Sequence, residues 1–305
     1  MKIWVHLYRL TPTVKSLKPR DGALLKVEWA VGQVGYSDLH PWPEFGEPSL
    51  EEQLQSLAYL KLTPLAEKSL EFNYQDREYR LLKRSAFLGL ILPRSHRLIL
   101  NLTSLDTLQL NEWQSAGYTH LKVKMGKDLK RETETLTQLA LASPLQWRID
   151  LNGRLETGRF LEWWKSLEPT VRARVDFIED PVKNGETLPE AGPWATDWVS
   201  LKNAGIRVVK AARDNADQLM SYDRVIFTHG MDHPLGQACA AWAASKFYAR
   251  YPKKTEICGL ADPDVYEPNL FSEVWRCPGP RLKPTPGMGF GFDEQLEAVA
   301  WERIL

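Results

Sequence analysis

The sequence has little that would link it to nucleic acid, a membrane or an oxidising compartment. Basic and acidic residues number 39 each, so the formal net charge is zero, and no basic excess favours nucleic acid or an anionic membrane surface. The three cysteines (Cys239, Cys258 and Cys277) are widely spaced and form no metal-ligand pattern, which favours free thiols in a reducing compartment. No apolar run approaches the roughly 20 residues that span a bilayer. The start, MKIWVHLYRL, alternates like a strand and lacks the pattern of a signal peptide. We therefore expect a cytoplasmic protein without nucleic-acid or membrane partners.

A dinucleotide-binding signature is also missing, because no GxGxxG follows an early strand. The 305 residues are 43% hydrophobic and 26% charged, which is ordinary for a soluble globular protein. This length is enough for one large domain or two smaller ones.

Residues 1–96 have the pattern of a small α+β domain. The stretch GALLKVEWAVGQVGYSDL predicts two strands around a turn at Gly32, and the proline-rich HPWPEFGEP that follows suits neither helix nor strand. Ser49 and Glu52 have capping-box spacing and predict that a helix begins there. A second helical pattern covers residues 65–82.

From residue 97 short apolar strands alternate with helical patterns. Repeated strand–helix units favour a parallel sheet, and eight candidate strands favour closure into a modified (β/α)8-type barrel over residues 97–280. An open doubly wound sheet is the alternative. The helices between the fourth and sixth strands look very short, so the barrel would be trimmed there. Residues 281–305 are expected to return to the N-terminal domain as an extended tail. The predicted strands are 97–102, 120–125, 146–152, 175–180, 194–199, 207–211, 224–230 and 255–260.

Polar residues stand at the carboxyl ends of these strands, where the active site of such a barrel lies. Residues two apart on a strand share a face, so Lys122 and Lys124 point the same way. Three carboxylates on adjacent strand ends make an all-oxygen site that suits Mg²⁺, or Mn²⁺ in its place. The strand-end set is Lys122, Lys124, Asp150, Glu179 with Asp180, Asp197, Lys210 and His229.

Lysines beside such a metal site would serve acid–base chemistry. We expect their charged neighbours and partial burial to lower their pKa values, so that a neutral lysine acts as a general base. Its target would be a proton alpha to a carboxylate, and the metal would stabilise the resulting enediolate. The expected partner is thus a small-molecule carboxylate.

Each residue also has a structural reading. A strand-end lysine is usually solvated, the segment IEDP could be a turn, and ATDW around Asp197 could equally be a surface turn. His229, Asp232 and His233 could suggest a metal cluster, although a loop before a helix starting at Pro234 fits them better. The ordered recurrence of K-x-K, D-x-N, E-D-P and V-V-K on successive strands favours function over chance.

At these residues the sequence resembles the enolase superfamily, in particular its muconate-lactonizing-enzyme-like group. Within it, the sequence is most similar to the o-succinylbenzoate synthase family, through RIDLNG, IEDP, VVKAARD, IFTHGMDHPLG and the HPWPEFGE loop. The resemblance covers about residues 20–295. It implies a lysine base with Mg²⁺ and dehydration of 2-succinyl-6-hydroxy-2,4-cyclohexadiene-1-carboxylate to o-succinylbenzoate in menaquinone biosynthesis.

The resemblance also implies a role for each residue. Lys124 would be the base with Lys122 beside it, Lys210 would face it across the substrate, and Asp150, Glu179 and Asp197 would hold the metal. Substrate contacts or their support would come from Arg148, Asn152, His229, Gly230, Met231 and Phe45, the last within a loop that closes over the substrate.

Other functions remain open. An N-acylamino acid or dipeptide racemase would use the same two lysines on opposite faces of its substrate. A sugar-acid dehydratase fits less well because it usually needs a His–Asp base pair where this chain has Lys210. Muconate cycloisomerisation and a non-catalytic barrel scaffold are further alternatives. The sequence leaves monomer and homo-oligomer undecided.

Overall fold

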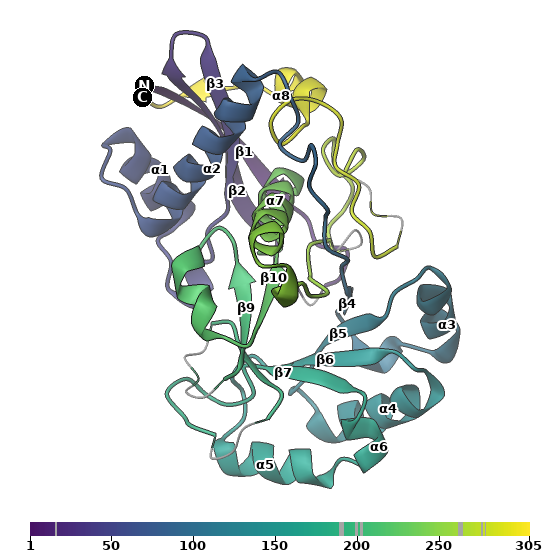
Figure 1. Ribbon diagram of the computed structural model, residues 1–305. Helices are drawn as coiled ribbons and strands as arrows, with labels where there is room; N and C mark the ends of the chain where they lie inside the picture. The colour runs from purple at the N-terminus through teal and green to yellow at the C-terminus, as the bar shows by residue number, and fades with distance from the viewer. Residues whose placement is uncertain are drawn as a thin grey trace.

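The fold was analysed in a computed structural model that describes residues 1–15, 17–188, 192–198, 201, 204–261, 265–275, 277 and 279–305. The chain forms an antiparallel sheet and a larger parallel sheet, and helix α7 (Pro234–Arg250) lies between them (Figure 1).

The antiparallel sheet has the strand order β11-β1-β2-β3. Gly32, with φ of 74°, makes the turn between β2 and β3, a left-handed conformation that glycine adopts without steric cost. The short strand β11 brings the end of the chain back to pair with β1. The strands are β1 (Lys2–Leu10), β2 (Arg20–Ala30), β3 (Gln33–Leu39) and β11 (Glu302–Arg303).

Two helices cover one face of this sheet. Helix α1 (Leu50–Ala58) begins with the predicted capping box, in which Ser49 and Glu52 hydrogen-bond each other's backbone N–H. Helix α2 (Pro64–Leu81) has Thr63 as its N-cap. Their apolar side chains pack with those of the strands into one core, so hydrophobic burial holds the helices to the sheet.

The parallel sheet runs in the order β10-β9-β8-β7-β6-β5-β4. It curls so that both edges contact one segment: Cys258 bridges Ser95 beside β4, and Gly259 bridges Thr228 at the end of β10. This is the predicted barrel-type arrangement rather than an open sheet. The strands are β4 (Arg97–Ile99), β5 (His120–Lys124), β6 (Gln146–Asp150), β7 (Val175–Glu179), β8 (Trp194–Thr196), β9 (Ile206–Lys210) and β10 (Arg224–Thr228).

The barrel is less regular than eight full strand–helix units. The predicted eighth strand makes only isolated bridges, at Cys258 and Gly259, because this segment touches each sheet edge at a single residue. Between β7 and β9 the described residues contain no helix, which agrees with the predicted trimming; Val199 of the predicted fifth strand lies outside the described residues. The division of the chain into an N-terminal domain, a barrel and a tail, with boundaries after residues 96 and 280, stays a prediction.

Helices cover the outside of β4 to β7, whereas the connection between β9 and β10 contains only a 3₁₀ helix (Figure 1). The remaining α-helices are α3 (Thr107–Ser115), α4 (Leu129–Ala142), α5 (Thr157–Ser166), α6 (Pro169–Arg172) and α8 (Asp293–Ala298). The 3₁₀ helices are η1 (Pro43–Phe45), η2 (Leu102–Ser104), η3 (Ala216–Ser221) and η4 (Pro252–Lys254).

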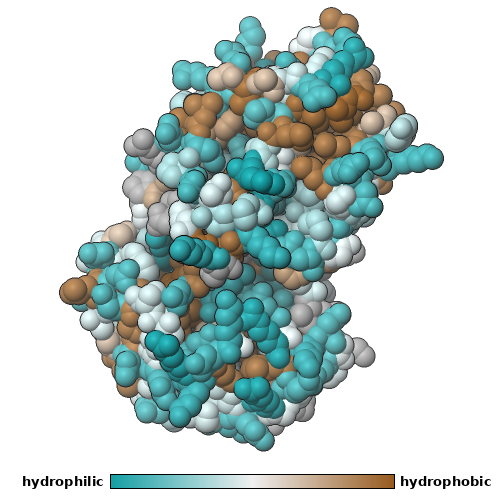
Figure 2. Space-filling model, turned by 180° about the vertical axis from the view of Figure 1, so that it is seen from behind, coloured by the Kyte–Doolittle hydropathy of each residue, from teal (hydrophilic) through white to brown (hydrophobic). Residues whose placement is uncertain are grey.

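Hydrophilic side chains dominate the face seen from behind, and hydrophobic ones gather on the half that holds the antiparallel sheet (Figure 2). Among the described residues, no helix combines the length and the apolar character needed to cross a membrane.

Candidate active site

The carboxyl ends of the parallel strands meet around one small cavity of about 60 Å³. Lys124, Asp150 and Glu179 are register partners on β5, β6 and β7, so parallel pairing alone brings them side by side. Of the residues predicted for the site, all but Arg148 line this cavity: Phe45, Lys122, Lys124, Asp150, Asn152, Glu179, Asp197, Lys210, His229, Gly230 and Met231.

Lys122 is the most strongly paired of the three lysines. Its Nζ lies 2.7 Å from both carboxylate oxygens of Glu179 and 3.3 Å from Asp150 Oδ2. Although burial opposes it, the charge of these carboxylates raises the pKa of Lys122 far above its ordinary value. Without a metal the neighbours of Lys122 are anions that favour its ammonium form, so the lowered pKa expected beside a bound metal stays a prediction.

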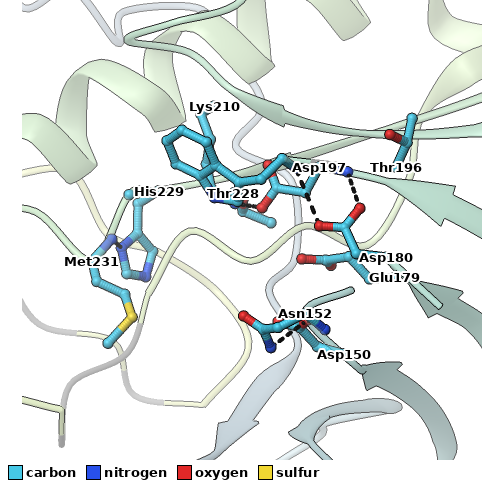
Figure 3. A network of polar contacts seen from close by, with 12 residues as sticks. Asp150, Asn152, Glu179, Asp180, Thr196, Asp197, Lys210, Thr228, His229 and Met231 are labelled. Carbon is cyan, nitrogen blue, oxygen red and sulfur yellow. Dashed lines mark hydrogen bonds and ion pairs between the residues drawn. The ribbon is translucent and has the colours of Figure 1, made fainter. Parts of the chain in front are cut away.

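Lys210, at the end of β9, sits on the other side of the carboxylates. Its ammonium donates to Asp197 Oδ2 over 2.6 Å and to Thr228 Oγ1 over 2.7 Å (Figure 3). The reading of Asp197 as part of a solvated surface turn does not hold, because its carboxylate is only 6% exposed.

Lys124 differs from the other two lysines. It lines the cavity and is partly exposed, and its ammonium makes no hydrogen bond or ion pair with the described residues. An amine without a fixed partner is the one best placed to exchange a proton with a bound molecule, since no hydrogen bond must break first.

Backbone conformation holds the carboxylates in place. Asn152 has φ of 50° and donates from its backbone and side chain to Asp150 Oδ1 over 3.1 and 2.8 Å. Asp180 has φ of 43°, and its carboxylate accepts the backbone N–H groups of Asp197 and Trp198 over 2.9 and 3.2 Å (Figure 3). Left-handed backbone at residues other than glycine is costly and often concentrates at functional sites.

Arg148 lies beneath the cavity instead of lining it, so direct substrate contact is not what the structure indicates. Its guanidinium donates to Asp176 over 2.8 Å and to the Ile257 carbonyl over 2.7 Å, and Nη1 lies 3.1 Å from His96 Nδ1. Arg148 points inward because its side chain alternates with the neighbouring residues of a barrel strand. It can act on the site only by supporting His96, which does line the cavity.

His96 is a site residue that the sequence did not reveal. It is 3% exposed, and burial together with the Arg148 charge lowers its pKa well below the ordinary value, so the ring is neutral. A Cβ on residue 259 would lie 2.5 Å from this ring, so glycine is needed there. His96 precedes its strand rather than ending it, and no motif marked it.

Aromatic residues from both domains roof the cavity. Phe45 stacks on Trp198 with ring centroids 4.3 Å apart, and Trp42 Nε1 donates to the Gly230 carbonyl over 2.9 Å. Arg213, just after β9, makes a two-pronged ion pair with Glu47 at 2.6 and 2.9 Å. The loop around η1 is thus tied to the barrel on both sides. Asp180, which the sequence placed in the strand-end set beside Glu179, also lines the cavity, as do Trp198 and Thr228, for which the sequence indicated no role.

The donor set fits a hard divalent cation. Asp150 and Glu179 are 4% and 2% exposed, and carboxylate oxygens are what Mg²⁺ prefers. Burial raises the pKa of Glu179 to about 8 and that of Asp180 to about 6, which signals a surplus of buried negative charge that a cation would relieve. In the present side-chain arrangement the lysine ammoniums occupy these oxygens, and the described residues form no ready cluster of three metal ligands. A metal would therefore have to displace Lys122 or Lys210 from part of its contacts.

Comparison with known structures places this fold in a class. The chain adopts the fold of the enolase superfamily: L-Ala-D/L-Glu epimerase from Bacillus subtilis superposes with a TM-score of 0.76 at 14% identity, over 95% of this chain and 97% of the epimerase. An o-succinylbenzoate synthase from Thermosynechococcus elongatus BP-1, with Mg in its active site, gives a TM-score of 0.60 at 20% identity, over 85% and 92% of the two chains.

Sequence narrows the class to one family. The family model for the O-succinylbenzoate synthase N-terminal domain matches residues 3–79. The o-succinylbenzoate synthase of Bdellovibrio bacteriovorus is 31% identical over 100% of this chain and 99% of its own length. The chain belongs to the o-succinylbenzoate synthase family.

Proposed function

We propose that the protein is an o-succinylbenzoate synthase, a carbon–oxygen lyase that dehydrates 2-succinyl-6-hydroxy-2,4-cyclohexadiene-1-carboxylate to o-succinylbenzoate in menaquinone biosynthesis. The observation that carries the proposal is the strand-end cavity, where an unpaired lysine and two carboxylate-bound lysines surround three buried carboxylates. Family membership over the full chain supports the choice of substrate.

In this proposal Lys124 removes the proton alpha to the substrate carboxylate. The electron pair of that C–H bond first delocalises into the carboxylate and then forms the new ring double bond as the C–O bond breaks. Lys124 returns its proton to the departing hydroxyl, which leaves as water. Lys210 stays an ammonium and neutralises negative charge that develops on the carboxylate. The product ring is aromatic, so the elimination is favourable and modest electrostatic help suffices.

The metal would contribute to the reaction electrostatically. When bound by Asp150, Glu179 and Asp197, Mg²⁺ (or Mn²⁺) would supply positive charge beside the substrate carboxylate. Lys122 holds two of these carboxylates in place from below, at 2.7 Å from Glu179 and 3.3 Å from Asp150.

Substrate entry requires movement of the roof. The cavity of about 60 Å³ is much smaller than the roughly 300–1,000 Å³ typical of pockets for small ligands. The loop with Trp42 and Phe45 would therefore open to admit the substrate and then exclude water once it closes.

A racemase of N-acylamino acids or dipeptides is the second candidate. Lys124 and Lys210 could each exchange a proton on one face of such a substrate, and the fold is shared with dipeptide epimerases. A non-catalytic scaffold fits less well, because unsupported charged strand ends cost stability and this chain has kept them all.

A substrate panel distinguishes these functions. The purified protein would be supplied with Mg²⁺ and either the cyclohexadiene substrate, N-acylamino acids or dipeptides, and aromatic product and racemisation would be measured separately. Formation of o-succinylbenzoate supports the proposal. Racemisation without o-succinylbenzoate keeps the lysines but overturns the substrate, and the absence of both reactions favours the scaffold.

A further inference from the structure

A second, smaller cavity lies where the antiparallel-sheet domain meets the barrel. Its volume is about 20 Å³, and a single buried water needs about 10–15 Å³. It shares Lys210, Thr228, His229 and Gly230 with the site cavity. Its other charged or polar wall residues come from both domains: Asp38 and His40 at the end of β3, Arg213 just after β9, and Asp232 in the loop between β10 and α7.

Three buried atoms of these wall residues lack a hydrogen-bond partner among the described residues: Asp38 Oδ2, His40 Nε2 and Asp232 Oδ1. His40 and Asp232 are only 3% and 5% exposed. Asp232 Oδ1 lies 3.6 Å from His229 Nδ1, beyond a direct hydrogen bond. Unsatisfied polar atoms around a water-sized space indicate that something polar bridges them.

The proton inventory around the cavity can be counted. The Tyr8 hydroxyl donates its single hydrogen to Asp38 Oδ1 over 2.7 Å, and His40 Nδ1 lies 2.9 Å from the same hydroxyl. His40 Nδ1 must therefore be the donor in that contact. Burial lowers the pKa of His40 to about 3, so the ring is neutral and its Nε2 is a bare acceptor.

With Asp38 ionised, the cavity would face three acceptors: Asp38 Oδ2, His40 Nε2 and Asp232 Oδ1. One water offers only two hydrogens, so with Asp38 ionised the third acceptor would depend on the backbone N–H groups of Leu39 and His233, which face the Asp38 carboxyl group. With a proton on Asp38 Oδ2, the water accepts from Asp38 and donates to His40 and Asp232. That arrangement satisfies every atom.

The two carboxyl groups also converge on one point of the backbone. A Cβ on residue 236 would lie 2.3 Å from Asp38 Oδ2 and 3.0 Å from Asp232 Oδ2. Only glycine in the first turn of α7 allows both to approach. Buried carboxyl groups this close share a proton, because two adjacent negative charges repel each other.

We propose that Asp38 and Asp232 form a carboxyl pair that is bridged by one water and holds one proton, on Asp38. This pair joins the N-terminal domain to the β10–α7 loop and so positions His229–Met231 for the substrate. The loop is held from its other side by the hydrogen bond from Trp42 Nε1 to the Gly230 carbonyl. The Met231 backbone N–H donates to His229 Nδ1 over 2.9 Å and fixes the ring. Asp38 and Asp232 are thus positioning residues.

The surrounding charges agree with this placement of the proton. Burial and the charge of Asp232 raise the pKa of Asp38 well above its ordinary value. For Asp232, burial acts upward, but contact with His229 brings its pKa below the ordinary value. The other titratable or charged groups facing the pair are Tyr8, His40, Lys210, Arg213, His229, His233 and Cys239.

Infrared difference spectroscopy tests the pair without reference to catalysis. The carbonyl stretch of a protonated carboxyl group should persist at neutral pH, where ordinary carboxyl groups with pKa values of about 4 are ionised. Asp38→Asn should remove its own component of that band and leave the component of Glu179, whose pKa is about 8. The matched control Asp21→Asn, at an exposed aspartate paired with Arg9, should leave the whole band. Asp232→Asn should shift the loss of the band to lower pH, because the neighbouring negative charge is gone. An unchanged spectrum in Asp38→Asn would overturn the proposal.

The positioning role rests on the proposed function and has its own readout. Asp38→Ala should raise the KM for the cyclohexadiene substrate about tenfold with a smaller change in kcat, the size expected for one lost buried hydrogen-bonding group. Asp38→Asn, which resembles the protonated acid, should restore most of that loss. Equal KM values in wild type and Asp38→Ala would refute positioning. If Asp38→Ala does not fold, the asparagine variant and the spectra still test the carboxyl pair. A wild type that is inactive on this substrate would refute the proposed function but not the proton pair.

Discussion

Lys122 is surrounded by more negative charge than its own ammonium can neutralise. Two oxygens of Glu179 lie 2.7 Å from its Nζ, and Asp150 is next to them. The side chains of all three residues are at most 9% exposed. Charges buried this deeply are tolerable only while paired, because their removal from water is expensive.

Replacing Lys122 by methionine should therefore destabilise the metal-free protein by about 3–5 kcal/mol, since two buried carboxylates lose their partner. Urea unfolding monitored by circular dichroism would measure the change. Lys183→Met is the matched control, because Lys183 and its partner Glu156 are more than half exposed, and it should unfold like wild type. Equal stabilities of Lys122→Met and wild type would show that the pair is not what holds the site.

His120 predicts a pH dependence of stability. Burial and the nearby Arg148 lower its pKa to about 4, from an ordinary value near 6.5. Between these values the unfolded chain binds more protons than the native protein, so stability is present above pH 6.5 and is lost as pH falls toward 4. His120→Gln should reduce this slope by about 1 kcal/mol per pH unit, allowing for the partly exposed ring. Urea unfolding at pH 7, 6 and 5 would measure it, and identical slopes would contradict the assignment.

Among the elements, the η1 loop is joined to the barrel by an ion pair between Glu47 and Arg213. Arg213 donates from Nε and Nη2 to the two oxygens of Glu47, and its Nη2 also donates to the His40 carbonyl over 2.8 Å. Lysine cannot reproduce this planar fork. The loop that carries Trp42 and Phe45 over the cavity is held by that geometry.

Arg213→Lys should thus raise the substrate KM about tenfold while changing kcat less, because the roof closes less often but the lysines are untouched. Steady-state kinetics would show the split. Arg9→Lys is the control, since Arg9 makes a similar two-pronged pair with Asp21 on the surface. A fall in kcat at constant KM would mean that Arg213 acts in the chemical step instead.

Local chemistry explains which elements could be predicted. The capping box of α1 needs only Ser49 and Glu52, and the strand-end set follows from chain order and parallel register. The reduced eighth strand could not be predicted, because its pairing depends on how far the sheet curls. His96 was missed for a related reason: its place in the site depends on a contact with Arg148, which comes from another strand. Asp180 belonged to the strand-end set, but its hydrogen bond from the Trp198 backbone could not be predicted.

For the whole molecule, the proposed metal site predicts that stability depends on a divalent cation. A ligand that binds only the native state stabilises it by about 2.7 kcal/mol at a concentration 100 times its dissociation constant. Mg²⁺ should therefore raise the melting temperature of the wild type. Asp197→Asn should reduce that rise, because a neutral amide replaces a negatively charged carboxylate ligand. Asp21→Asn should respond like wild type. Equal responses of Asp197→Asn and wild type would remove Asp197 from the ligand set.

In the proposed mechanism Lys124 and a metal act together on a carbon acid, and a single assay decides whether both are needed. Conversion of the cyclohexadiene substrate to o-succinylbenzoate would be followed for wild type and Lys124→Ala, each with Mg²⁺ and with a chelator. The account predicts turnover only by the wild type with Mg²⁺. Turnover by Lys124→Ala, or by the wild type in chelator at an undiminished rate, would contradict it.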